Sequence, residues 1–248
     1  MGDTVMQAVV LAGGRGQRLA RAGAAQPKPL TPLCGLPVVD HVLAWLAIEG
    51  VTDVVVCLGY RAPEIAAVIG DGARFGLHAT CVTESEPLGT AGAVHAIRAQ
   101  LAERFFVIYA DVVADVDLRQ MAQAHAASGA IATLAVHPND HAFDSDRVVA
   151  DAQALIERIV RPGEAGAEAG GLCSAALYLL ERRAIEQLTY PEPSALVDFA
   201  RDLFPALCAA GERLMAYRTT EYIKDMGTPA RRAQVEADLA AGVPHALR

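Results

Sequence analysis

The sequence predicts an α/β fold, with a doubly wound, mainly parallel sheet in a three-layer α/β/α arrangement. Apolar, β-branched runs alternate with segments of helical periodicity as far as Asp111, and this alternation is typical of strand–helix–strand units with right-handed crossovers. The first apolar run, Ala8 to Leu11, ends in a cluster of glycines, which is typical of a buried strand that enters a loop.

The elements of the first half follow from short-range patterns. Valines at 54, 55 and 56 indicate a strand over 52–58, and Val39, Val42, Leu43 and Leu46 recur at helical spacing over 38–49. By the same reasoning we expect strands over 6–11, 78–84 and 105–109, a short helix over 63–69, and a helix that follows a second glycine turn and ends near 101.

The second half is less regular. We expect helices over 118–127, 194–204 and 206–211, an amphipathic helix over 229–241, and strands over 131–137, 148–149, 155–160, 173–180 and 214–218. The polar segment 137–146 is interpreted as an Asx-rich loop rather than a zinc site, because its His and Asp spacing matches no ligand pattern.

Composition excludes several classes of protein. The net charge is −8 and the pI is about 5.3, which argues against nucleic-acid binding because that binding requires a basic surface. No apolar stretch is long enough for a transmembrane helix. The five cysteines are scattered, without a disulfide framework or metal spacing. We therefore expect a cytoplasmic protein without a signal peptide, and most of its thiols as small core residues.

The glycine cluster has the features of an anion site. Gly13, Gly14 and Gly16 let backbone N–H groups approach a ligand closely, and successive N–H groups form a concavity that suits phosphate. Arg18 and Lys28 follow and add positive charge. The pattern predicts a site for a phosphate chain; a glycine turn with incidental surface cations is the plainer alternative.

Three known phosphate-loop patterns are relevant to this stretch. The Walker A spacing is absent. The dinucleotide fingerprint lacks its third glycine, which is replaced by Leu19, and no acidic residue follows at about 20 positions. The third template, G-G-x-G-x-R-L followed by P-K-P-L, is met in full by residues 13–19 and 27–30. In this respect the chain resembles the nucleotidyltransferases that join a nucleoside triphosphate to a sugar 1-phosphate.

Two acidic residues stand where a metal could bind. Asp111 follows the strand over 105–109 and would point into the ligand crevice of a parallel sheet, although a solvated loop acid is the plainer interpretation. Asp225 precedes Gly-Thr-Pro and could instead cap the last helix, where Thr228 and Pro229 suit the first positions. The residues alone leave both alternatives open.

The resemblance extends from Val9 to about Asp238 and assigns roles to these residues. It implies that Asp111 and Asp225 together hold Mg²⁺, and that Arg18, Lys28 and Asp111 are catalytic. The length of 248 residues is compatible with a single domain, 1–248, and the resemblance implies a nucleotide-binding half (about 1–115) and a sugar-binding half (about 116–248). The residues that would surround the triphosphate are Leu11, Ala12, Gly13, Gly14 and Gly16.

The turn Pro87–Gly92 matches the family's base-recognition turn, with Leu88 and Gly89 near the base edge. The carboxylate of Glu84 could accept hydrogen bonds from the N1–H and exocyclic amine of guanine, which would favour GTP. An exposed acid at a strand end is the alternative for Glu84.

On the sugar side, Arg161-Pro162 resembles the family's E-K-P segment, with Arg161 replacing the lysine that meets the sugar phosphate and Val160 replacing the glutamate. Ser174 and Tyr109 are the other candidate sugar-phosphate residues. Ala110 stands where the family usually has glycine, and residues 174–176, Ser-Ala-Ala, stand where it often has Asn-Ala-Gly. These departures suggest a modified sugar pocket or weakened activity.

The resemblance implies GTP and D-glycero-α-D-manno-heptose 1-phosphate as substrates, because residues 137–146 and 222–229 resemble the branch that makes GDP-activated heptoses. Mannose 1-phosphate and a UTP-dependent reaction are alternatives. A regulatory subunit that binds nucleotide sugar without turnover is the non-enzymatic alternative, and a Rossmann oxidoreductase is a further one. No nucleic acid or membrane partner is expected, and homologous enzymes are often homo-oligomers.

Overall fold

The computed structural model describes residues 6–14, 26–138, 145–164, 171–188 and 195–244. The chain divides into two compact units: unit 1 is Met1–Pro87, Ile108–Asp117 and Glu221–Arg248, and unit 2 is Leu88–Val107 and Leu118–Thr220. The predicted α/β class, with a mainly parallel central sheet, is confirmed. No helix within the described ranges is long and apolar enough to cross a membrane.

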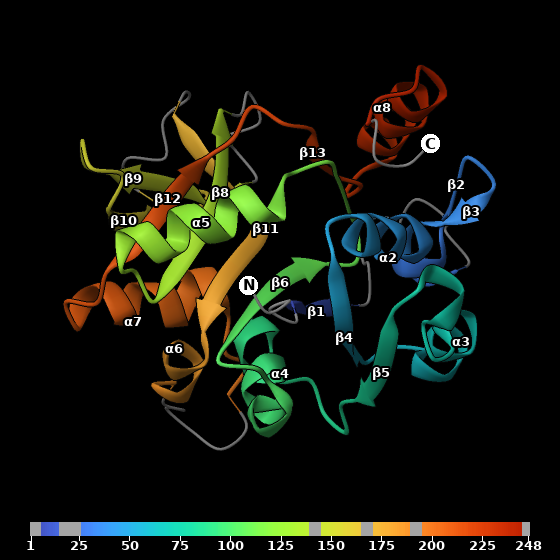
Figure 1. The fold of residues 1–248 in the computed structure, drawn as a ribbon, viewed down its shortest axis with the longest axis horizontal. Helices are drawn as coiled ribbons and strands as arrows, with labels where there is room; N and C mark the ends of the chain where they lie inside the picture. The colour runs from blue at the N-terminus through green and yellow to red at the C-terminus, as the bar shows by residue number, and fades with distance from the viewer. Residues whose placement is uncertain (1–5, 15–25, 139–144, 165–170, 189–194, 245–248) are drawn as a thin grey trace. The chain divides into compact units, whose positions relative to one another are not determined.

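Unit 1 is built on three parallel strands, β1 (Met6–Ala12), β4 (Val51–Leu58) and β5 (His78–Thr83). Figure 1 shows β4 and β5 side by side. Helices α2 (Val38–Ile48) and α3 (Ala62–Ile69) pack on β4, whose valines 54–56 are buried, and α3 also packs on β5. A 3₁₀ turn, η2 (Ala73–Phe75), leads into β5. All three strands run the same way, so their carboxyl ends lie at one edge.

Smaller elements of unit 1 bring the end of the chain back to this sheet. Strand β7 (Val112–Ala114) pairs antiparallel with β13 (Ile223–Asp225), and α8 (Pro229–Ala240) follows β13. A 3₁₀ turn, η1 (Lys28–Leu30), precedes the short hairpin of β2 (Pro32–Leu33) and β3 (Leu36–Pro37). These elements share one apolar cluster, formed by Leu33, Val38, Val113, Met226 and Val235.

Unit 2 contains a mixed sheet in the order β12-β8-β11-β9-β10, in which β12 is parallel to β8 and the other pairs are antiparallel. Figure 1 shows its strands beside α5, α6 and α7. Strand β6 begins in unit 2, next to β11, and its last two residues belong to unit 1. The elements are α4 (Thr90–Ala96), η3 (Arg98–Gln100), β6 (Arg104–Tyr109), α5 (Leu118–Ser128), β8 (Ala132–Pro138), β9 (Arg147–Ala150), β10 (Ile156–Val160), β11 (Leu172–Glu181), α6 (Arg182–Glu186), η4 (Phe199–Leu203), α7 (Phe204–Ala209) and β12 (Leu214–Arg218).

One predicted helix begins later than expected. The prediction placed a helix over 194–204, but residues 195–198 are not helical, and a π-type turn, η4, begins at Phe199 and runs directly into α7. The reason is a competing set of backbone bonds: Val197 N–H donates to Leu88 O, and Val197 O accepts from the N–H groups of Ala91 and Gly92. Val197 therefore pairs with the second glycine turn and is unavailable for helix formation.

Strand β11 contains an irregularity at the Ser-Ala-Ala segment. Its pairing with β8 shifts register between Ser174 and Tyr178, and Ala176 lies in the left-handed region with φ of 56°. A residue with a Cβ pays a steric cost of about 1–2 kcal/mol there, which glycine avoids. The structure therefore explains why glycine suits this position in the resembled pattern.

We expect Ala176→Gly to stabilise the protein by about 1 kcal/mol, because it removes this strain. For a chain of this size the melting temperature should rise by roughly 2–4 °C. Ala175→Gly, next to it, is the control: Ala175 has no positive φ, so glycine there should lower stability. Equal melting temperatures for the two variants would contradict the strain at Ala176.

Candidate active site

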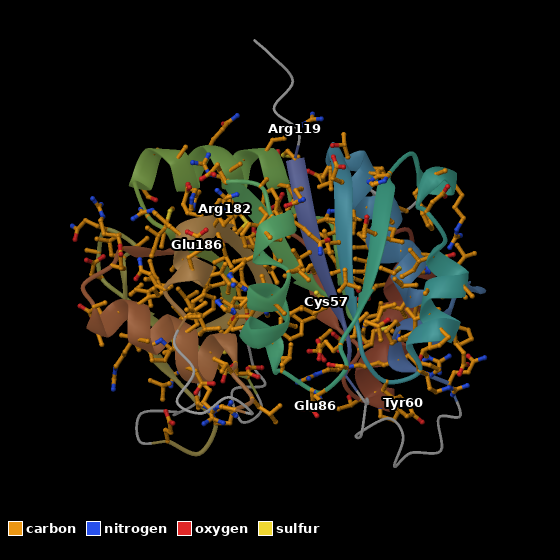
Figure 2. All side chains as sticks on the ribbon, turned by 90° about the horizontal axis from the view of Figure 1, so that it is seen from below. Cys57, Tyr60, Glu86, Arg119, Arg182 and Glu186 are labelled. Atoms are coloured by element: carbon orange, nitrogen blue, oxygen red, sulfur yellow. The ribbon has the colours of Figure 1, made fainter. Side chains whose placement is uncertain are left out.

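In unit 1 the carboxyl ends of β1 and β4 bring Gly13, a predicted site residue, next to Gly59 and Tyr60. Gly13 and Gly59 pack backbone to backbone: a Cβ on Gly59 would lie 2.8 Å from Gly13 O and 3.1 Å from its Cα. Tyr60 N–H donates to Gly13 O at 3.3 Å, and Figure 2 shows Tyr60 and Glu86 at the same end of the strands. The absence of a side chain at Gly59 thus lets the Gly13 backbone lie directly against it.

Glu84 lies at the same edge. Its backbone N–H donates to Leu58 O at 2.8 Å, and its Oε1 would be 3.5 Å from a Cβ placed on Gly13. Burial, followed by the nearby Glu84 charge, raises the pKa of the Cys57 thiol to about 12. Cys57 is therefore an unreactive core thiol. The half-buried carboxylate of Glu84 lies beside Gly13.

Lys28 and Asp111 form an ion pair between residues 83 positions apart. Lys28 begins the η1 turn and is flanked by Pro27 and Pro29, whose rings restrict the backbone. The two side chains are only 16% and 19% exposed. Asp111 follows β6, and the N–H of the preceding Ala110 donates to Leu11 O at 3.0 Å. The structure therefore places Lys28 against the acid that follows the central strand.

Asp225 is held next to Asp111 by backbone pairing. Asp225 pairs with Val112 in the β13–β7 ladder, and Met226 N–H donates to Asp111 O at 2.9 Å. Gly227 N–H donates to Asp225 Oδ1 at 2.6 Å, which orients the carboxylate. The two acids predicted as metal ligands therefore come from neighbouring backbone positions, although they are 114 positions apart in sequence.

Arg231 is a charged residue of this site that the sequence patterns did not identify. Its Nη1 lies 3.1 Å from both carboxylate oxygens of Asp225. Thr228 is the N-cap of α8 and accepts from Arg231 N–H, with Pro229 at the first helical turn. Because Thr228 caps the helix, Asp225 is not required for that task.

The two carboxylates suit Mg²⁺, which is usually bound through one or two protein carboxylates and completed by substrate phosphates. Among the described residues there is no group of three or more His, Cys, Asp or Glu that could hold a metal by themselves. A metal at Asp111 and Asp225 would thus depend on phosphate oxygens for its other ligands.

The second glycine turn is shaped by contacts within unit 2. Gly89 has φ of +79°, and a Cβ on it would lie 2.4 Å from Val197 O and 2.7 Å from Val197 N. Leu88 O accepts from Val197 N–H at 2.9 Å. Glycine at position 89 is therefore required by packing, whatever the turn contacts in a complex.

Arg161 and Ser174 both interact with Asp146 in unit 2. Ser174 N–H donates to Asp146 O at 2.9 Å. Burial raises the pKa of the Asp146 carboxyl, and Arg161 opposes this rise. Ser174 Oγ also lies 3.4 Å from the hydroxyl of Tyr178. Asp146, the last residue of the predicted Asx-rich loop, is thus a second residue of interest, and no separate role was predicted for it.

The remaining candidates are placed as follows. Tyr109 ends β6 in unit 1 and is half-buried, and Leu11 and Ala12 end β1. Gly14 is exposed after β1. Gly16 and Arg18 lie outside the described residues, as does most of the 137–146 loop, and their predicted roles stay predictions.

We expect Gly59→Ala to weaken the affinity for a nucleoside triphosphate about tenfold, equivalent to roughly 1.4 kcal/mol, because its Cβ would displace the Gly13 backbone. Gly76→Ala is the control: Gly76 has φ of +76° with open space around it, so it should lose stability but not affinity. Equilibrium binding of a fluorescent triphosphate checks both. Unchanged affinity in Gly59→Ala would show that the Gly13 backbone does not contact the ligand.

Comparison with known proteins places this site in a family. Residues 7–241 match the family model described as nucleotidyl transferase. A mannose-1-phosphate guanylyltransferase of Mycobacterium tuberculosis is 33% identical over 96% of this chain and 66% of its own length. A mannose-1-phosphate guanyltransferase of Schizosaccharomyces pombe is 31% identical over 90% of this chain and 61% of its own. The chain thus spans less than two thirds of the length of these relatives.

Solved structures agree on the fold. The crystal structure of HddC from Yersinia pseudotuberculosis matches with a TM-score of 0.82 at 23% identity, covering 95% of this chain and 100% of that chain. A crystal structure of HddC complexed with GMP-PN matches with a TM-score of 0.81, also at 23% identity and over the same shares of the two chains. With the match over residues 7–241, the chain belongs to the nucleotidyl transferase family.

Proposed function

We propose that this chain transfers the guanylyl group of GTP to the 1-phosphate of a manno-configured sugar. An oxygen of the sugar phosphate attacks the α-phosphorus, the bond to the β-phosphate oxygen breaks, and pyrophosphate leaves. Such a transfer needs alignment and charge neutralisation rather than a protein nucleophile. The observation that carries the proposal is the grouping of Lys28, Asp111 and Asp225 in unit 1.

Each group of unit 1 would have a separate task. Backbone N–H groups from Gly13 onward bind phosphate oxygens, and Lys28, which pairs with Asp111 in this structure, offsets charge on the departing pyrophosphate. Asp111 and Asp225 would hold Mg²⁺, which supplies positive charge at the α-phosphate when bound. Arg18, outside the described residues, is proposed as the second cation.

Guanine is the base that Glu84 suits best. A carboxylate can accept from both the N1–H and the exocyclic amine of guanine, whereas adenine presents an acceptor at N1. Glu84 lies beside Gly13, at the loop proposed to bind the triphosphate. The names of the curated relatives, which are guanylyltransferases, support the same nucleotide.

Two sugar 1-phosphates are candidates for the acceptor. The relatives' names favour mannose 1-phosphate, and the sequence resemblance of residues 137–146 and 222–229 favours D-glycero-α-D-manno-heptose 1-phosphate. Arg161 would bind the sugar phosphate. Val160 is buried and cannot replace the glutamate of the resembled segment, so Asp146 is the nearby carboxylate proposed to meet sugar hydroxyls.

The test is pyrophosphate release, measured with four nucleoside triphosphates against mannose, heptose, glucose and N-acetylglucosamine 1-phosphates. We expect turnover with GTP and a manno-configured acceptor, and a loss of about 10²–10³ in kcat for Asp111→Asn and for Asp225→Asn, because each removes one electrostatic contact in the transition state. Near-full turnover in both folded variants would refute the assigned roles. Nucleotide binding without pyrophosphate release at any Mg²⁺ concentration would support the regulatory-subunit alternative instead.

We expect Glu84→Gln to lower kcat/KM for GTP about 30-fold, the equivalent of roughly 2 kcal/mol for a hydrogen bond to a charged group. Steady-state kinetics with ITP should show a smaller loss, since inosine lacks the exocyclic amine. Glu86→Gln, an exposed residue of the same loop, is the control and should change neither value. An equal loss with GTP and ITP would mean that Glu84 does not read the amine.

A further inference from the structure

Each candidate metal-binding carboxylate is paired with a cation in this structure. Asp111 is bound by Lys28, and Asp225 is bound by Arg231. The formal charges of these two acids and two cations cancel. A divalent cation that approached this pair would therefore meet little net attraction, unlike a cation that approaches two unpaired carboxylates.

The Arg231 contact is built into the fold. Its Nη1 is equidistant, at 3.1 Å, from the two oxygens of Asp225, and its side chain is 17% exposed against 40% for Asp225. The backbone of Arg231 is fixed in the first turn of α8 by Thr228. On the other side of the carboxylate, Gly227 N–H holds Oδ1 at 2.6 Å.

We propose that Arg231 is a positioning residue that keeps Asp225 oriented and charge-compensated, so that the divalent metal binds as the metal–triphosphate complex and only weakly before the nucleotide. The proposal rests on the proposed function of this site. A triphosphate adds several negative charges. These restore the attraction for a divalent cation that Arg231 and Lys28 cancel at Asp225 and Asp111. Arg231 thereby couples metal binding to nucleotide binding.

The experiment uses Mn²⁺ as the probe, with the loss of its free-ion paramagnetic resonance signal as the readout. The wild type should bind Mn²⁺ weakly alone and tightly with GTP, without any sugar phosphate. Arg231→Gln should bind Mn²⁺ alone about tenfold tighter, a modest part of the attraction between charges at this range, and should show a smaller gain on adding GTP.

Lys224→Gln is the matched control. It removes one positive charge from the residue next to Asp225, but Lys224 pairs with Asp238 instead, so its Mn²⁺ affinity should equal that of the wild type. Arg231→Lys keeps a cation at the position and should also remain weak. Adding Asp225→Asn to Arg231→Gln should abolish the gained affinity.

Two results would overturn the proposal: Mn²⁺ binding by folded Arg231→Gln that is no tighter than by the wild type, or an equal gain in Lys224→Gln. If Arg231→Gln does not fold, tight nucleotide-independent Mn²⁺ binding by the wild type or by Arg231→Lys refutes the proposal, and weak binding by both supports it. The titration needs no turnover. Failure of the pyrophosphate assay with a positive titration would therefore refute the proposed reaction but not the role of Arg231.

Discussion

The ion pair between Lys28 and Asp111 is the interaction on which the site of unit 1 depends. Both side chains are mostly shielded from water, and an unpaired charge in such a place would be costly. The pair also fixes geometry, because it ties the rigid Pro-Lys-Pro turn to the end of β6. Any ligand that separates the two charges must replace the contact that each one loses, and a metal-bound triphosphate could do so on both sides.

The same site requires that the chain return to its first unit after a long excursion. Residues 221–248 belong to unit 1, and the three-residue strands β7 and β13 make the connection. Such a short ladder would be unstable by itself. It is stabilised by the buried cluster around Val113 and Met226, to which α2 and α8 contribute. This apolar packing therefore helps to keep Asp111 and Asp225 at a fixed spacing.

The sequence predicts those parts of the fold and the site that depend on short-range residue patterns. Apolar runs that end in glycine predicted β1 and β4. With the strand predicted over 78–84, they placed Gly13 and Glu84 at one edge. Gly59 carries the same signal as Gly13, a glycine after a buried strand, and was missed only because no template includes it. Arg231 could not be found in this way, since its contact with Asp225 depends on the angle at which α8 leaves β13. At residues 195–198 the helical pattern of the sequence is overridden by backbone hydrogen bonds between Val197 and the second glycine turn, which is distant in sequence.

The structure shows different consequences for the three positions at which the sequence departs from the resembled pattern. Ala110 is 2% exposed, and its N–H bonds to β1, so its methyl group lies in the core and leaves Asp111 paired with Lys28. Ala176 adds strain to an irregular strand without removing a charged group. Val160 does remove one, because a buried apolar side chain replaces a carboxylate. The charged residues of the resembled pattern in unit 1 are thus retained, whereas in unit 2 an apolar side chain replaces a carboxylate.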